Sequence, residues 1–145
     1  MSVTLSQASL IVDVALKKGR ELKLAPLTVA VLDAGGHLVA FKREDGSGIM
    51  RYDIAYGKAW GSLGMGFGTR EVVKRSAANL AFLTAFSAAS GGRLIPSPGG
   101  VLIRDAAGKV IGAVGISGDS GDKDETCALA GIEAAGLTGD TGAGL

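Results

Sequence analysis

Apolar residues recur at helical spacing in several segments of the chain, and polar residues mark where these segments begin. A capping box of Thr4 and Gln7 precedes the first of them, which runs to about Leu22. Thr69 is interpreted as the cap of a short later helix, and Asp122 with Glu125 as a second capping box that opens the last one. The predicted helices are 5–22, 53–63, 71–75, 77–89 and 122–136.

Two segments of the same design predict β-hairpins, each with two apolar strands around a tight turn. In each turn an Asp is followed three residues later by a Gly. The Asp side chain can bond its own turn backbone, and the Gly can take the positive φ that a tight reversal requires. The pairs are Asp33 with Gly36, in segment 29–40, and Asp105 with Gly108, in segment 101–112.

The predicted order is α-β-β-α-α-α-β-β-α. Strand 37–42 is apolar on both faces, so we expect helices to cover both sides of the sheet. The fold class is therefore α/β (α+β), with one antiparallel sheet built from two hairpins. We expect a single domain over residues 1–137 and a flexible tail over 138–145, which is rich in Gly and Thr.

Composition and charge exclude several classes of protein. The net charge is only +1, and no basic stripe with aromatic residues is present, so we expect neither nucleic-acid nor membrane binding. No apolar run approaches the roughly 20 residues that span a bilayer. The single Cys127 excludes an internal disulfide framework, and no signal-peptide pattern opens the chain. We therefore expect a cytoplasmic, bacterial-type protein.

A run of three glycines, Gly112-x-x-Gly115-x-x-Gly118, superficially resembles a loop that cradles an anion. Four carboxylates follow it at positions 119, 122, 124 and 125, and they would repel a phosphate. Helix capping by these carboxylates is the favoured interpretation. A cation site and a polar ligand site remain as alternatives, although the spacing does not match a calcium loop.

Three longer segments resemble the GlcG/HbpS family across nearly the whole chain. They begin at Asp33 (DAGGHLVAFKREDG), at Asp53 (DIAYGKA) and at Pro98 (PGGVLIRDAAGKVIGAVGISG, followed by DKDETCALAGI). The resemblance implies a profilin-like domain and a homo-oligomer, even-numbered up to an octamer. It also implies binding of haem, or a role beside corrinoid and glycolate metabolism.

Haem binding requires an axial ligand and an apolar slot. His37 is the only histidine, so an imidazole ligand must come from it; the alternative is a turn histidine bonded to backbone or water. Met50 and Met65 are weaker candidate ligands, or else core-filling residues. Cys127, beside acidic residues in the last helix, is interpreted as a buried and inert thiol.

An enzyme hypothesis places Lys58 and Glu125 face to face at the open end of the sheet, where they would transfer a proton next to a carbonyl. Arg43, Arg51 and Arg104 would hold a substrate carboxylate; the alternative is a set of salt bridges between subunits. No motif indicates hydrolase, zinc or redox chemistry, and no metal site other than a haem ligand is expected.

The favoured hypothesis is a homo-oligomer that binds a small ligand, with haem or a related tetrapyrrole as the leading candidate. The second is a small enzyme or accessory protein of organic-acid or cofactor metabolism, and the third is a structural assembly factor without a ligand. The expected ligand-binding residues are His37, Arg43, Arg51, Lys58, Arg104, Asp124 and Glu125.

Overall fold

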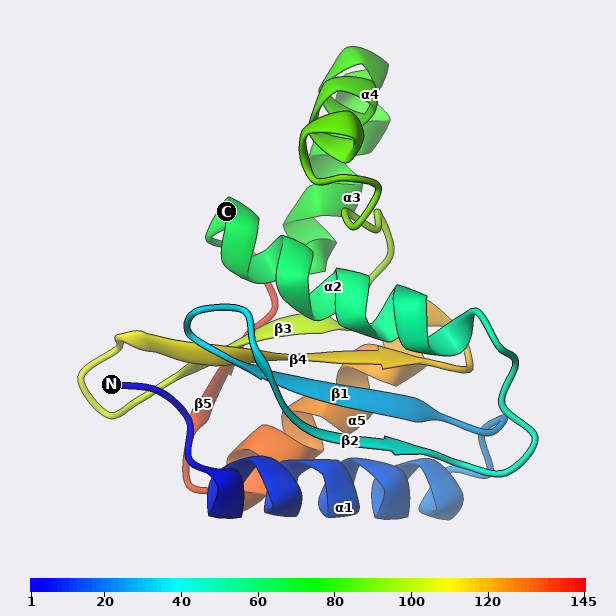
Figure 1. Cartoon of the computed structure of the whole chain (residues 1–145), viewed down its shortest axis with the longest axis vertical. Helices are drawn as coiled ribbons and strands as arrows, with labels where there is room; N and C mark the ends of the chain where they lie inside the picture. Colours follow the sequence, from blue (N-terminus) through cyan, green and yellow to red (C-terminus); the bar gives the residue numbers. More distant parts are fainter.

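One five-stranded antiparallel sheet, with helices on both faces, forms the centre of the computed structural model, which describes residues 1–145 (Figure 1). The strands lie in the order β2-β1-β4-β3-β5. The predicted fold class and order of elements are confirmed, with one added strand, β5. The elements are α1 (Leu5–Glu21), β1 (Thr28–Asp33), β2 (Leu38–Arg43), α2 (Arg51–Met65), α3 (Thr69–Ala78), α4 (Leu80–Ala89), β3 (Gly100–Arg104), β4 (Val110–Ser117), α5 (Gly121–Ala134) and β5 (Thr138–Asp140).

The two predicted hairpins, β1–β2 and β3–β4, are joined through β1 and β4 at the centre of the sheet. In the first turn, Asp33 Oδ1 accepts hydrogen bonds of 2.9 Å from the amides of Gly35 and His37, and Gly36 has φ of +83°. Asp105 repeats the pattern in the second turn. The β1–β4 register places both turns at the same end of the sheet, because Asp33 pairs with Gly112.

Helices α1 and α5 cover one face of the sheet, and α2 covers the other (Figure 1). The main hydrophobic core lies under α1 and α5, while a smaller cluster around Leu32, Ala59 and Leu102 lies under α2. Helices α3 and α4 project away from the sheet beyond α2 (Figure 1). No helix combines the length and the apolar character that a membrane span needs.

The glycine run in and after β4 serves close packing between backbones. A methyl group on any of these three glycines would overlap a carbonyl oxygen of a neighbouring segment. Only glycine fits at these positions, because no side-chain rotation can relieve a clash with backbone atoms. The pairs are Gly112 with Leu32, Gly115 with Ala55 of α2, and Gly118 with Pro26.

Two predicted helix starts are wrong. The N-cap of α3 is Gly68, and Thr69 turns its side chain toward β3, where its Oγ1 accepts a hydrogen bond of 2.8 Å from the Gly100 amide. The helix predicted over 77–89 begins only at Leu80, because Asn79 leaves helical geometry and its side chain accepts from the first amides of α4. Local capping by Asn79 overrides the apolar periodicity that runs through it.

The last helix also begins differently from the prediction. Its N-cap is Ser120, and Asp122 and Glu125 bind Arg70 instead of closing a capping box. Beyond it, the segment for which a flexible tail was expected contains β5, which pairs with β3. This strand is short, and its Thr-Gly-Asp sequence carries no apolar alternation that would have predicted it.

Candidate functional site

A buried ion pair joins the middle of α2 to the start of α5. Lys58 Nζ donates hydrogen bonds to the carbonyl of Ile116 at 2.8 Å and to Asp124 Oδ2 at 3.2 Å. The two side chains are 3% and 1% exposed. Desolvation by burial lowers the pKa of Lys58 and raises the pKa of Asp124, so burial opposes the charged form of both groups.

Glu125, the predicted partner of Lys58, faces a different residue. Its carboxylate accepts three hydrogen bonds from Arg70 of α3, at 3.0 and 3.2 Å from Nε and at 3.0 Å from Nη2. Arg70 also binds the exposed Asp122, and these hydrogen bonds to the carboxylates raise the pKa of Arg70. The structure therefore does not bring Lys58 and Glu125 together. Lys58 binds Asp124 instead, and Glu125 binds Arg70.

Of the three arginines expected to hold a substrate carboxylate, Arg104 lies apart from the other two. Arg51 donates to Ser117 Oγ at 3.0 Å, at the end of β4, and Arg43 donates to the carbonyl of Ser47. Arg104 lies at the other end of the sheet, in an ion pair with Asp140 at 2.8 Å. None of the cavities in the protein is lined by Lys58, Glu125 or Arg104. The predicted lysine, glutamate and arginines therefore do not line one cavity together.

His37 lies in the first hairpin turn with its side chain 80% exposed. Its Nδ1 lies 3.1 Å from Asp33 Oδ1. Burial acts to raise the pKa of Asp33, but the hydrogen bonds from the His37 and Gly35 amides outweigh it and the pKa is lowered. An ionised Asp33 at Nδ1 directs the other ring nitrogen, Nε2, outward, as carboxylates do for histidines that ligate metals.

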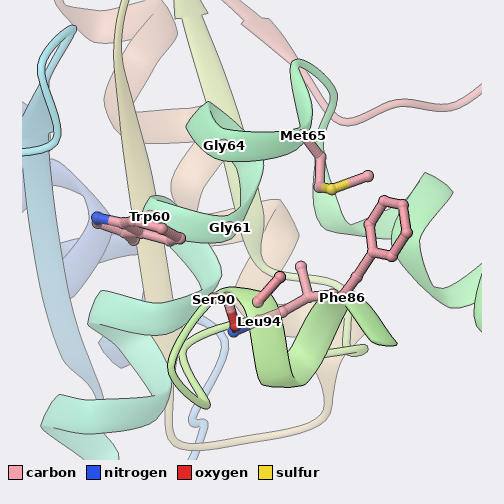
Figure 2. Close-up of a pocket in the computed structure, with 8 residues that line it drawn as sticks. Trp60, Gly61, Gly64, Met65, Phe86, Ser90 and Leu94 are labelled. Atoms are coloured by element: carbon pink, nitrogen blue, oxygen red, sulfur yellow. The ribbon is translucent and has the colours of Figure 1, made fainter. Parts of the chain in front are cut away.

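Two shallow cavities lie on the outer side of α2, and Trp60 and Gly64 line both of them. The cavity next to His37, of about 190 Å³, has the turn residues Ala34–Gly36 and Leu63 as its other walls. The second cavity, of about 170 Å³, lies between α2, α4 and Leu94. Figure 2 shows Met65 and Phe86 next to one another on the side away from Trp60. Both are smaller than the roughly 300–1,000 Å³ of sites that bury a drug-sized ligand.

The remaining candidate ligands are scattered. Met50 is exposed at the start of α2, and Met65 lies at its end, against Phe86. Cys127 is fully buried, as predicted, and desolvation together with Asp124 raises the pKa of its thiol to about 11. No group of three His, Cys, Asp or Glu side chains is arranged to hold a metal ion.

The residues that the sequence interpretation missed are aromatic and cationic. Trp60 lies under the guanidinium of Arg93, whose Cζ is 3.8 Å from the ring centroid. Trp60 is the single tryptophan of the chain, a signal that the interpretation did not use. The pairing with Arg93 follows from the path of the loop after α4, which no periodicity predicts.

Comparison with known proteins identifies a family. The family described as haem-degrading, HbpS-like proteins matches residues 3–133. Among curated proteins, none matches the sequence of the chain.

Solved structures with the same fold cover nearly the whole chain. A structure of HbpS is 27% identical with a TM-score of 0.78, and the alignment covers 92% of this chain and 90% of that one. Protein ORFY of Klebsiella pneumoniae is 26% identical with a TM-score of 0.82, covering 92% and 90%. A PduOC–haem complex is 24% identical with a TM-score of 0.84, covering 94% and 97%, and shows likeness of fold.

Proposed function

The chain belongs to the HbpS-like family of haem-degrading proteins, and from this premise we propose that it binds haem or a related tetrapyrrole with His37 as the axial ligand. The family relates the chain to haem, and the fold is shared with a PduOC domain whose structure was solved with haem. The identity of the ligand and its contacts in this chain are the proposal.

The observation that carries the proposal is the environment of His37. The imidazole is exposed, and its Nδ1 contacts a carboxylate that two backbone amides hold in place. An imidazole held against a carboxylate through Nδ1 has a restricted ring orientation and leaves Nε2 free, as an axial haem ligand requires.

A shallow cavity beside the hairpin turn that carries His37 offers a surface for the porphyrin. The cavity beside the turn is walled by Trp60 and Leu63 of α2, and Gly36 leaves the indole uncovered on that side. At about 190 Å³ it is too shallow to enclose a macrocycle, so Trp60 and Leu63 would supply only part of the contact surface of a bound porphyrin. Chemistry at a bound iron would be that of the haem; this chain supplies the ligand, the apolar wall and the access.

A haemin titration tests this function. We expect the wild-type protein to give a saturating Soret change at one haem per chain, and His37→Ala to weaken binding at least about tenfold. Lys109→Ala is the matched control, because Lys109 occupies the position equivalent to His37 in the second hairpin, four residues after Asp105. Equal affinities of wild type and His37→Ala would contradict the proposal.

We propose also that copies of this chain assemble through α4. Residues 76–92 contain no charged side chain, and α4 contains no buried residue. Leu80 is 72% exposed and Phe86 is 42% exposed. A helix that carries no charge, is mostly apolar and projects from the domain (Figure 1) needs a partner. A second copy of the chain presents the same helix.

Light scattering coupled to size exclusion measures this assembly. We expect an even-numbered oligomer for the wild type and a smaller species for Leu80→Lys, because a charge in an apolar interface must be desolvated. Ile49→Lys places the same charge on an equally apolar residue of an exposed loop and should leave the mass unchanged. A monomeric wild type would contradict assembly through α4.

A further inference from the structure

The second cavity on α2 is an apolar pocket of about 170 Å³ (Figure 2). A cation lies at its rim, over the Trp60 ring. Its walls are Trp60 and Met65 from α2, Phe86 from α4 and Leu94 from the loop that follows. Arg93 directly precedes Leu94, and its guanidinium covers the Trp60 ring at 3.8 Å. The indole is therefore shared between the apolar wall and the charged rim.

Arg93 is held in this position from three sides. Its Nε donates a hydrogen bond of 2.8 Å to the Ser90 carbonyl. Its own carbonyl lies so close to α2 that a methyl group on Gly57 would overlap it. Stacking on Trp60 fixes the plane of the guanidinium. An arginine immobilised before binding loses little further conformational entropy when it takes a ligand.

The terminal N–H groups of Arg93 have no acceptor within the protein. Four other arginines, Arg20, Arg70, Arg75 and Arg104, are each paired with a carboxylate. Arg93 has no such partner, and residues 72–104 contain no Asp or Glu at all. The positive charge at this rim is therefore uncompensated, and the guanidinium presents a planar fork of donors to solvent.

We propose that this pocket binds a carboxylate carried on an apolar body, with the carboxylate on Arg93 and the body against Trp60, Met65 and Phe86. A guanidinium binds a carboxylate through two parallel hydrogen bonds, which a lysine or a neutral donor does not reproduce. Two sources carry this chemistry: a free short-chain acid, and the propionate edge of a tetrapyrrole held at His37. Only the second source rests on the proposed haem function.

Titration of Trp60 fluorescence with octanoate tests the free-acid source. Trp60 is the only tryptophan, so its emission reports on ligands at the two cavities that it lines. The dependence on Arg93 assigns the change to this pocket. Octan-1-ol has the same body without the charge and serves as the neutral control. We expect octanoate to saturate, and Arg93→Gln to weaken it at least about tenfold while leaving octan-1-ol unaffected. Lys109→Gln removes the same charge from an exposed turn and should change neither titration.

Titration with haemin and with haemin dimethyl ester tests the propionate source. If the propionates bind Arg93, Arg93→Gln weakens haemin at least about tenfold, but the diester binds both proteins equally. Arg93→Lys, which keeps the charge and loses the fork, should restore only part of the affinity. If neither octanoate nor haemin affinity depends on Arg93, the proposal is overturned. The protein could also bind octanoate in an Arg93-dependent way and bind no haemin. That result would support the carboxylate site and refute the haem function.

Discussion

Gly115→Ala is expected to lower the free energy of unfolding by about 3 kcal/mol or more, or to prevent folding. Gly115 lies in β4, directly under α2, and an added methyl group would overlap the carbonyl oxygen of Ala55 and press on the amide of Ala59. Both neighbours are helix backbone, so no rotamer change relieves the clash, and α2 must move off the sheet. Urea unfolding followed by circular dichroism measures the loss.

Gly48→Ala is the control for this substitution. Gly48 lies in an exposed loop at negative φ, and its nearest neighbour is the side chain of Arg51 at 3.9 Å. The alanine there should change stability by less than about 0.5 kcal/mol. Equal stabilities of Gly115→Ala and Gly48→Ala would show that α2 does not dock on β4 at this distance, and would contradict the packing described for this face.

Lys58→Met and Asp124→Asn are each expected to lower stability by about 3–5 kcal/mol, because either one leaves the other charge buried without its partner. The protein with both substitutions should be destabilised by less than the sum of the two single losses, and the difference should be at least about 2 kcal/mol. Burial lowers the pKa of Lys58 and raises that of Asp124, so desolvation costs more than the attraction returns. Replacing both charges therefore removes that cost.

The comparison for this pair is the exposed pair of Lys42 and Asp13, in which the side chains are 61% and 57% exposed. Lys42→Met should cost no more than about 1 kcal/mol, since solvent screens such a pair. Strictly additive losses for Lys58→Met and Asp124→Asn would contradict the ion pair. A wild-type-like stability of either single variant would contradict its burial.

The sequence predicts well where a short local rule decides the structure. The turns at Asp33 and Asp105 follow from bonds between a side chain and its own backbone, within four residues. The fold class follows from two such hairpins with apolar strands. The helix break at Asn79 is also local. It was missed because the prediction followed the apolar periodicity past Asn79, although asparagine favours the N-cap position of a helix.

The partners of charged residues could not be predicted, because they depend on how elements far apart in the chain pack. Lys58 and Glu125 were expected to meet, yet α3 places Arg70 against Glu125, and Asp124, one residue earlier in α5, takes Lys58. A shift of one position on a helix turns a side chain by about 100°. Spacing alone therefore selects the right region but not the right carboxylate.

The site on the outer side of α2 was missed for a related reason. Sequence patterns identify His37 because the residue type is unique, but they do not show that Trp60 lies beside the same turn. Nor do they show that the chain comes back to α2 after α3 and α4, so that Arg93 lies over Trp60. These contacts follow from the close approach that Gly57 and Gly61 allow between α2 and the loop 93–95.

The most direct test of the central claim, that Nε2 of His37 ligates haem iron, is chemical rescue of His37→Gly by imidazole. The Soret spectrum and affinity of the ferric complex are measured with and without added imidazole, against Lys109→Gly and protein-free haemin as controls. We expect His37→Gly to lose the wild-type spectrum and imidazole to restore both spectrum and affinity. An unchanged spectrum in His37→Gly, with no effect of imidazole, would contradict ligation by His37.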